Sequence, residues 1–153
     1  MLGLTIALHV LATVIWVGGM FFAHQCLRPA AVDVLDPPQR LRLWRRAFAR
    51  FFPWVWVCVA VLLATGLWMM FGVFGGFQGP LYVHVMFGIG LVMMAIFMHV
   101  YFAPYRRLVR AVVAEDWSLG ARALAQIRVL IGVNLSLGLL VVAIASAGRY
   151  LAF

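Results

Sequence analysis

The sequence predicts an all-α integral membrane protein: a four-helix bundle that forms a single domain over residues 1–153. Hydrophobic residues make up 67% of the chain, charged residues only 10%, and the mean hydropathy is +1.08. A soluble domain needs a more polar surface than this composition can supply. Four apolar segments, each near the ~20 residues that a membrane-spanning helix requires, give the number of helices.

The first predicted helix covers residues 2–25, an apolar run without a charged side chain. Pro37 and Pro38 then punctuate the chain, and the segment 40–50 is amphipathic and rich in arginine. The second predicted helix covers residues 52–74. It follows directly on this segment, and the tryptophans of its opening RFFPWVW suit a membrane interface.

The third predicted helix covers residues 81–103, after the uncharged turn GVFGGFQGP. The fourth covers residues 127–148. Before it, the segment EDWSLGARALAQIR offers Ser118 as a helix N-cap. Because neither of the longer connections has room for a second domain, we expect the four helices to form one unit.

Arginine placement predicts the orientation in the membrane. All 12 basic residues are arginine, the net charge is +8, and they cluster in the first and last connections while the turn at 72–80 carries none. The positive-inside rule therefore places both arginine-rich connections in the cytoplasm and both termini outside. This arrangement makes the lipid bilayer, and not nucleic acid, the expected partner of the positive charge.

The four histidines form a regular pattern. His9 and His24 lie fifteen residues apart in the first helix, and His84 and His99 lie fifteen apart in the third. Because these two helices run parallel, the spacing predicts two pairs, His9 with His84 and His24 with His99, separated by about 22 Å along the membrane normal. A polar side chain in hydrocarbon is costly, so four of them indicate a function.

The same spacing indicates an internal duplication. The segments HVLATVIWVGGMFFAH and HVMFGIGLVMMAIFMH align at both histidines, at the first valine and at one phenylalanine, and each is followed by proline and arginine. A repeated helix hairpin, related by an axis along the membrane normal, would produce this match.

Two facing histidines in an apolar bundle suit haem b, whose iron takes an imidazole from each side. Diagonal helices of a four-helix bundle leave room for two side chains and an iron between them. Glycines would let the ring approach the backbone, and Arg149 at one end, with Arg28 and Arg106 at the other, could pair with the propionates. The sequence thus predicts haem held by His9, His84, His24 and His99, with two haems as the expected number.

Copper is the alternative cofactor or cargo. Thioethers and thiolates favour Cu(I), and Met20 and Cys26 lie close to His24 in the sequence, as Met98 lies next to His99. Methionine is also an ordinary apolar filler of membrane helices, so these residues carry less weight than the histidine pattern.

The segments HVLATVIWVGGMFFAHQCLRPA, RFFPWVW, LYVHVMFGIG and FAPYRRL resemble the bacterial copper resistance protein D (CopD) family over essentially the whole chain. The resemblance implies a role in copper uptake or tolerance at the bacterial inner membrane, where the outer side predicted for both termini of this multi-pass chain is the periplasm. This chain resembles a minimal version, without the further helices and periplasmic domain of longer members. His9, followed by Trp16 and then a glycine, is similar to the opening helix of HemJ-type protoporphyrinogen oxidases, which implies haem or porphyrin chemistry at His9.

Three functions are therefore open. The first is a b-type cytochrome that passes electrons across the membrane to a quinone or a periplasmic or cytoplasmic partner, alone or as a homo-oligomer. The second is copper transport or tolerance, and the third is HemJ-like porphyrinogen oxidation. No catalytic residue is assigned, so activity as an oxidoreductase stays open; all four acidic residues fall in the arginine-rich connections: Asp33, Asp36, Glu115 and Asp116.

Overall fold

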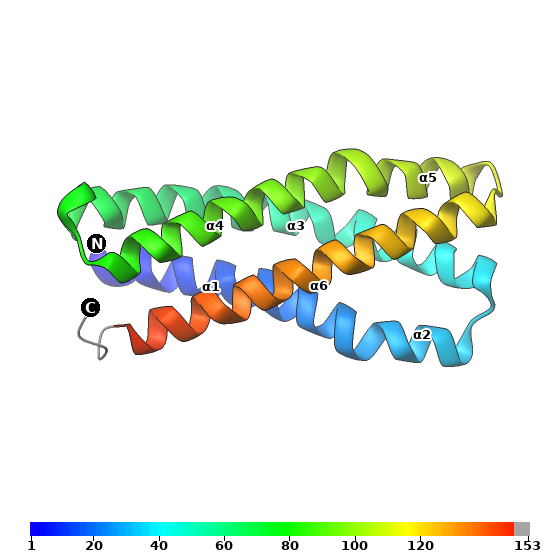
Figure 1. Cartoon of the computed structure of the whole chain (residues 1–153), viewed down its shortest axis with the longest axis horizontal. Coiled ribbons are helices and arrows are strands. Elements are labelled where there is room, and N and C mark those ends of the chain that lie inside the picture. The colour runs from blue at the N-terminus through cyan, green and yellow to red at the C-terminus, as the bar shows by residue number, and fades with distance from the viewer. Residues whose placement is uncertain (149–153) are drawn as a thin grey trace.

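The computed structural model describes residues 1–148 as four long helices that run up and down beside one another (Figure 1). Each helix is long and apolar enough to cross a membrane, and the continuous helical segments are Leu2–Val34, Pro37–Gly72, Leu81–Val113 and Trp117–Ala147. Many apolar side chains face outward, as at Leu11 and Val14, which are 58% and 60% exposed. The predicted all-α membrane bundle is confirmed.

Two of the four helices change their winding near one end. The first comprises α1 (Leu2–Phe21), a π-helical turn (Phe22–Leu27) and α2 (Arg28–Val34). The third comprises α4 (Leu81–Val100), a π-helical turn (Tyr101–Tyr105) and α5 (Arg106–Val113). The second and fourth are uninterrupted, α3 (Pro37–Gly72) and α6 (Trp117–Ala147), and a short 3₁₀ turn (Gly76–Gln78) precedes α4.

A proline accompanies each π-helical turn. Pro29 lies five residues after His24, and Pro104 lies five residues after His99. Proline offers no N–H to the helix and its ring crowds the carbonyl four residues earlier, and a wider turn relieves both problems. The two histidine segments therefore match in backbone as well as in sequence, which supports the predicted repeat.

Three helices extend further than the apolar segments predict. The second helix begins at Pro37, because Gln39 and Asp36 form a reciprocal capping box in which the Asp36 N–H donates to Gln39 Oε1 at 3.3 Å. The amphipathic segment 40–50 thus continues directly into the membrane span. The first and third helices likewise continue to Val34 and Val113.

The fourth helix also starts earlier than predicted, at Trp117. Its N-cap is Asp116, whose Oδ1 accepts a hydrogen bond of 2.9 Å from the N–H of Leu119. The prediction of Ser118 as N-cap was wrong by two residues. The negative charge of this carboxylate also interacts favourably with the positive end of the helix dipole.

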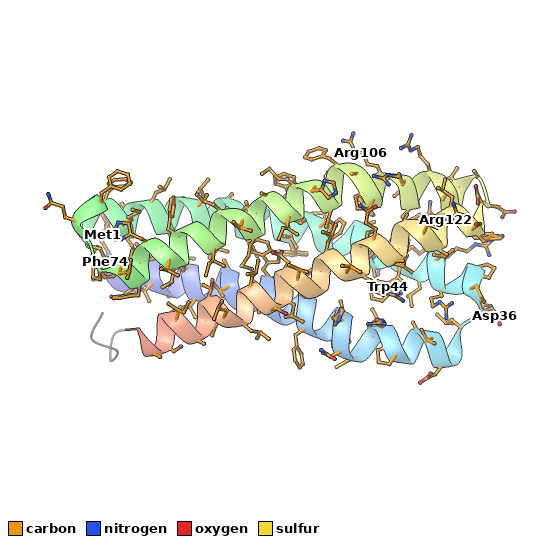
Figure 2. The ribbon with its side chains drawn as sticks, viewed as in Figure 1. Met1, Asp36, Trp44, Phe74, Arg106 and Arg122 are labelled. Carbon is orange, nitrogen blue, oxygen red and sulfur yellow. The ribbon has the colours of Figure 1, made fainter. Side chains whose placement is uncertain are left out.

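The helices pack in two close pairs: α1 runs along α3, and α4 runs along α6, while α5 contacts both α6 and α3. Helices α1 and α4 are diagonal to each other, as the sequence predicts for the two histidine helices. Figure 2 shows Met1 and Phe74 at one end of the bundle, with Arg122 and Asp36 toward the other.

This polarity divides the bundle into two parts. The cavity half comprises residues 1–17, 60–94 and 133–148 and contains no charged side chain. The arginine half comprises residues 18–59 and 95–132 and contains all four acidic residues and every arginine except Arg149. Aromatic rings fill its centre around Phe52, which stacks on Phe48 at 5.0 Å and meets Tyr105 edge-on at 4.8 Å.

Candidate functional site

A large apolar cavity of about 480 Å³ lies in the cavity half, bounded by α1, α3, α4 and α6. Its few polar side chains are His9, Thr13 and Tyr82. Five of the eight methionines line it, and they come from two helices: Met69, Met70, Met86, Met93 and Met94. Imidazole and thioether groups are thus the nitrogen and sulfur ligands that this cavity offers to a metal.

A hydrogen-bond chain orients His9, which is half-buried on α1. The Thr65 hydroxyl on α3 donates to the Val61 carbonyl at 2.6 Å, so its oxygen is left to accept from the Nδ1–H of His9 at 2.7 Å. The neutral imidazole therefore carries its hydrogen on Nδ1, and the lone pair of Nε2 stays available to a metal. The ring rests against Gly66, where a Cβ atom would lie 3.6 Å from its Cε1.

The predicted partner of His9 has a different environment. His84 lies in the first turn of α4, where its Nδ1 donates to the Pro80 carbonyl at 3.1 Å, and its ring is 6.5 Å from that of Phe77. It does not line the cavity that contains His9. The pairing of these two histidines around an iron therefore stays a prediction.

The two histidines of the second predicted pair, His24 and His99, also lie in different environments. His24 lies in the π-helical turn and faces α6 at Gly132, where a Cβ atom would lie 3.3 Å from the Cε1 of the ring. His99 is exposed on the surface of α4. Within residues 1–148, no three histidine, cysteine, aspartate or glutamate side chains gather in a metal-binding group.

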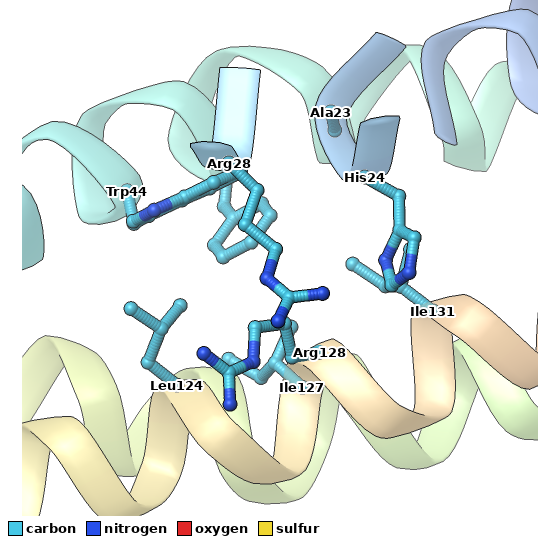
Figure 3. Close-up of a pocket in the computed structure, with 9 residues that line it drawn as sticks. Ala23, His24, Arg28, Trp44, Leu124, Ile127, Arg128 and Ile131 are labelled. Carbon is cyan, nitrogen blue, oxygen red and sulfur yellow. The ribbon is translucent and has the colours of Figure 1, made fainter. Parts of the chain in front are cut away.

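His24 lines a small cleft of about 20 Å³ in the arginine half, which we call the basic cleft. It is formed by the π-helical turn, α2, α3 and α6 (Figure 3). Two arginines line it together with His24, over an apolar floor, and the full set is Ala23, His24, Arg28, Trp44, Phe48, Leu124, Ile127, Arg128 and Ile131. Arg28, predicted to meet a haem propionate, is therefore placed beside a histidine and a second arginine.

The other two predicted propionate ligands differ from Arg28. Arg106 is exposed, and its guanidinium lies over the ring of Phe102 at 4.9 Å. Arg149 lies outside the described residues.

The predicted copper ligands near His24 and His99 do not share one environment. Met20 is buried, and its Sδ accepts a 3.7 Å hydrogen bond from Nδ2 of Asn134, a buried amide on α6. Cys26 and Met98 are both exposed. A copper site made from all three is therefore not assembled in the described residues.

Two features of the cavity were not predicted from the sequence. One is Thr65, whose role depends on the register of α3 against α1. The other is the gathering of methionines, for which a signal exists: the doublets Met69-Met70 and Met93-Met94 lie on helices that meet in the same half of the bundle. Comparing the depths of residues on different helices, and not only residues that are neighbours in the sequence, would have predicted that these methionines lie in the same half of the bundle.

Comparison with known proteins adds the family. A family model described as "Copper resistance protein D" matches residues 45–147, more than half of the chain. No curated protein sequence and no solved structure gives a match. The matched segment contains most of α3 and all of α4, α5 and α6. The chain thus belongs to the copper resistance protein D (CopD) family, as a helical multi-pass membrane protein related to copper resistance.

Proposed function

We propose that the protein binds Cu(I) as its cargo in the apolar cavity, through Nε2 of His9 and the thioethers around it. The observation that carries this proposal is the composition of the cavity: five methionines and one oriented histidine line a single space. The CopD family independently connects the chain with copper.

The donor set suits Cu(I) better than other biological metal ions. Thioether sulfur is a soft ligand that favours Cu(I), and imidazole binds copper well. Mg²⁺ and Ca²⁺ require oxygen ligands, most often carboxylates, and the cavity half contains no acidic residue. Because Cu(I) carries a single charge, neutral ligands can hold it in an apolar site at less electrostatic cost than a divalent ion.

Haem b is the second candidate, favoured by the size and shape of the same cavity. About 480 Å³ of mostly apolar space is available, and Gly66, Gly90 and Gly138 line it without side chains. His9 would supply the axial ligand on α1. A second imidazole from His84 is not available as the structure stands, because His84 does not line this cavity and its ring would have to turn into it, a rearrangement that Cu(I) binding does not require. Electron transfer to a quinone or a periplasmic partner, or a HemJ-like activity, would follow only from this second candidate.

Metal analysis and an absorption spectrum of the protein purified in detergent separate the two candidates. We expect Cu(I) to bind with a defined stoichiometry in competition with a chromogenic chelator, and His9→Ala to weaken this binding strongly. The haem candidate would be correct, and the copper candidate wrong, if the purified protein showed a b-type haem spectrum that His9→Ala abolishes and bound no Cu(I).

Two variants test the cavity itself. A Cβ atom on Gly90 would meet no atom within 4 Å, so Gly90→Leu can fill the cavity without displacing the backbone. We expect it to fold and to lose Cu(I) binding. The double variant Met93→Leu/Met94→Leu should lose affinity because aliphatic carbon does not bind Cu(I), whereas Met98→Leu, an exposed control, should not. Equal affinity in all three variants would exclude this cavity.

The orientation proposed from the arginines places the cavity toward the periplasm and the arginine half toward the cytoplasm of a bacterial inner membrane. The support is the division of charge between the two halves of the bundle. Single cysteines introduced at 74–80 should react with an impermeant reagent added from the periplasm, and cysteines introduced at 110–120 should not. The reverse labelling pattern would invert the orientation and turn the cavity toward the cytoplasm.

A further inference from the structure

The basic cleft brings two arginines together from different helices. Figure 3 shows the guanidinium groups of Arg28 and Arg128 pointing into the same space, with His24 beside them. Arg28 comes from the start of α2 and Arg128 from α6. Like charges repel, so a bound anion between these two guanidinium groups would be favoured.

Helix register explains why these side chains meet. His24 and Arg28 lie four residues apart on one helix, and Arg128 and Gly132 lie four residues apart on the antiparallel α6. The His24 ring occupies the place that a side chain at Gly132 would take, since a Cβ there would lie 3.3 Å from Cε1 and 3.7 Å from Nε2. With His24 opposite Gly132, Arg28 falls opposite Arg128.

The protein supplies no negative charge to this pair within the described residues. No acidic side chain lines the cleft, and neither arginine forms an ion pair or a hydrogen bond. The ion pair that residues 1–148 do form, between Arg42 and Glu115 at 3.1 Å, lies at the exposed end of the bundle. An anion bound between these two arginines would therefore come from outside the chain.

The depth of the cleft indicates which anion is available. From Leu2 to Leu27 on one helix, and from Val129 to Ala147 on α6, there is no charged side chain. Arg28 and Arg128 are thus the first charges at the edge of the apolar zone on both helices. Lipid head-group phosphates lie at this level, and guanidinium groups bind phosphate oxygens through paired hydrogen bonds.

We propose that the basic cleft binds a phosphate group through Arg28 and Arg128, with a ring N–H of His24 as an additional donor. The phosphate comes from the head group of an anionic phospholipid or from free phosphate, which present the same oxygens. The floor of the cleft is apolar and includes Trp44 and Ile127, and because the cleft itself has only about 20 Å³ of space, the phosphate rests at its mouth against the two guanidinium groups. The site is independent of the copper cavity in the other half of the bundle.

The test measures thermal unfolding of the full chain in phosphatidylcholine nanodiscs, with increasing fractions of phosphatidylglycerol or with added inorganic phosphate. Phosphatidylglycerol should raise the unfolding midpoint of the parent protein. In Arg28→Gln and Arg128→Gln, the half-saturating lipid fraction should rise about tenfold or more, the loss expected for a hydrogen bond to a charged group. Inorganic phosphate that gives the same arginine-dependent rise would identify free phosphate, and not lipid, as the source.

Arg122→Gln is the matched control, because Arg122 is exposed on the same helix, carries the same charge and does not line the cleft. It should retain the parent response. In pure phosphatidylcholine, whose phosphate is neutralised by its own choline cation, Arg128→Gln should unfold at about the same temperature as the parent, which shows that the variant folds. An equal loss of response in Arg122→Gln, or an unchanged response in Arg28→Gln and Arg128→Gln, would overturn the proposal.

Discussion

The cavity half and the arginine half of this bundle are built on opposite principles. Aromatic rings fill the arginine half, and side chains such as Leu108 and Ile127 are completely buried there. The cavity half leaves about 480 Å³ of space, open to the outside, between the same four helices and has no charged side chain. Empty space destabilises a helix bundle, because the atoms that line it lose van der Waals contacts.

If the cavity binds Cu(I) as proposed, the two halves divide stability and ligand binding between them. The arginine half supplies packing and carries all the arginines of the described residues. The cavity half gives up packing to keep an imidazole and five thioethers around one space. Variants that affect stability and variants that affect binding should therefore map to opposite ends of the molecule.

The largest expected effect is on the aromatic core of the arginine half. Phe52 is only 3% exposed and contacts four aromatic rings, so Phe52→Ala should lower the free energy of unfolding by about 3–5 kcal/mol. Leu63→Ala, at a partly exposed position that lines the cavity, should cost only about 1 kcal/mol. Reversible unfolding in mixed detergent, followed by circular dichroism, measures both. Similar losses would mean that the two halves contribute equally to stability.

A smaller effect is expected from a pair of glycines that both line the cavity. A Cβ atom on Gly138 would lie 2.9 Å from Cγ2 of Val17 and 3.1 Å from Cε of Met93, so Gly138→Ala should cost about 1–3 kcal/mol through overpacking. At Gly90, where nothing lies within 4 Å, Gly90→Ala should be neutral or stabilise the helix by up to about 1 kcal/mol. The same unfolding assay decides between them. If neither variant lowers the free energy of unfolding, Val17 and Met93 can move aside for a methyl group at Gly138, contrary to this prediction.

The next effect concerns the orientation of His9. Thr65→Val keeps the shape of the side chain but removes the acceptor of the Nδ1–H bond, and it should weaken Cu(I) binding about tenfold, as loss of a supporting hydrogen bond to a metal ligand does. Thr13→Val is the matched control, since the Thr13 hydroxyl lines the same cavity but donates to the backbone carbonyl of His9 at 2.9 Å. Equal Cu(I) affinity in the two variants would contradict the role of Thr65.

The smallest effect is expected at the surface of the arginine half. The Arg42–Glu115 ion pair joins side chains that are 53% and 68% exposed, where solvent screens the attraction. Glu115→Gln should therefore change the free energy of unfolding by about 0.5 kcal/mol or less, and salt should abolish the difference. A large, salt-resistant loss would show that this pair is part of the fold and not only a surface contact.

The sequence predicts the four spans because hydrophobic length responds directly to membrane thickness. It does not predict where the helices end, because the backbone continues as long as its hydrogen bonds and caps allow. Arg40 and Arg50 lie outside the apolar run yet remain within α3. The cap at Asp36 sets the beginning of this helix, and the apolar pattern carries no information about that cap.

The candidate site shows a different limit. Spacing along a helix gives the depth of each histidine but not the direction in which it points. His84 lies in the first turn of α4, where the Pro80 carbonyl is available to bind its ring, while His9 meets Thr65 of the neighbouring helix. The π-helical turn also changes the rotation of the chain around His24. Residues at one level can therefore face different neighbours, which only the helix register decides.

One buried amide has a consequence for assembly. Asn134 is 3% exposed, its Nδ2 donates to Met20 Sδ, and its Oδ1 has no hydrogen-bond partner within residues 1–148. This amide adds little to the stability of the native bundle. A slide of α6 along α1 by one turn, however, would leave both polar ends of the amide facing hydrocarbon, where each unpaired group is costly. The bond from Asn134 to Met20 therefore favours the height of α6 at which Gly132 also lies against His24.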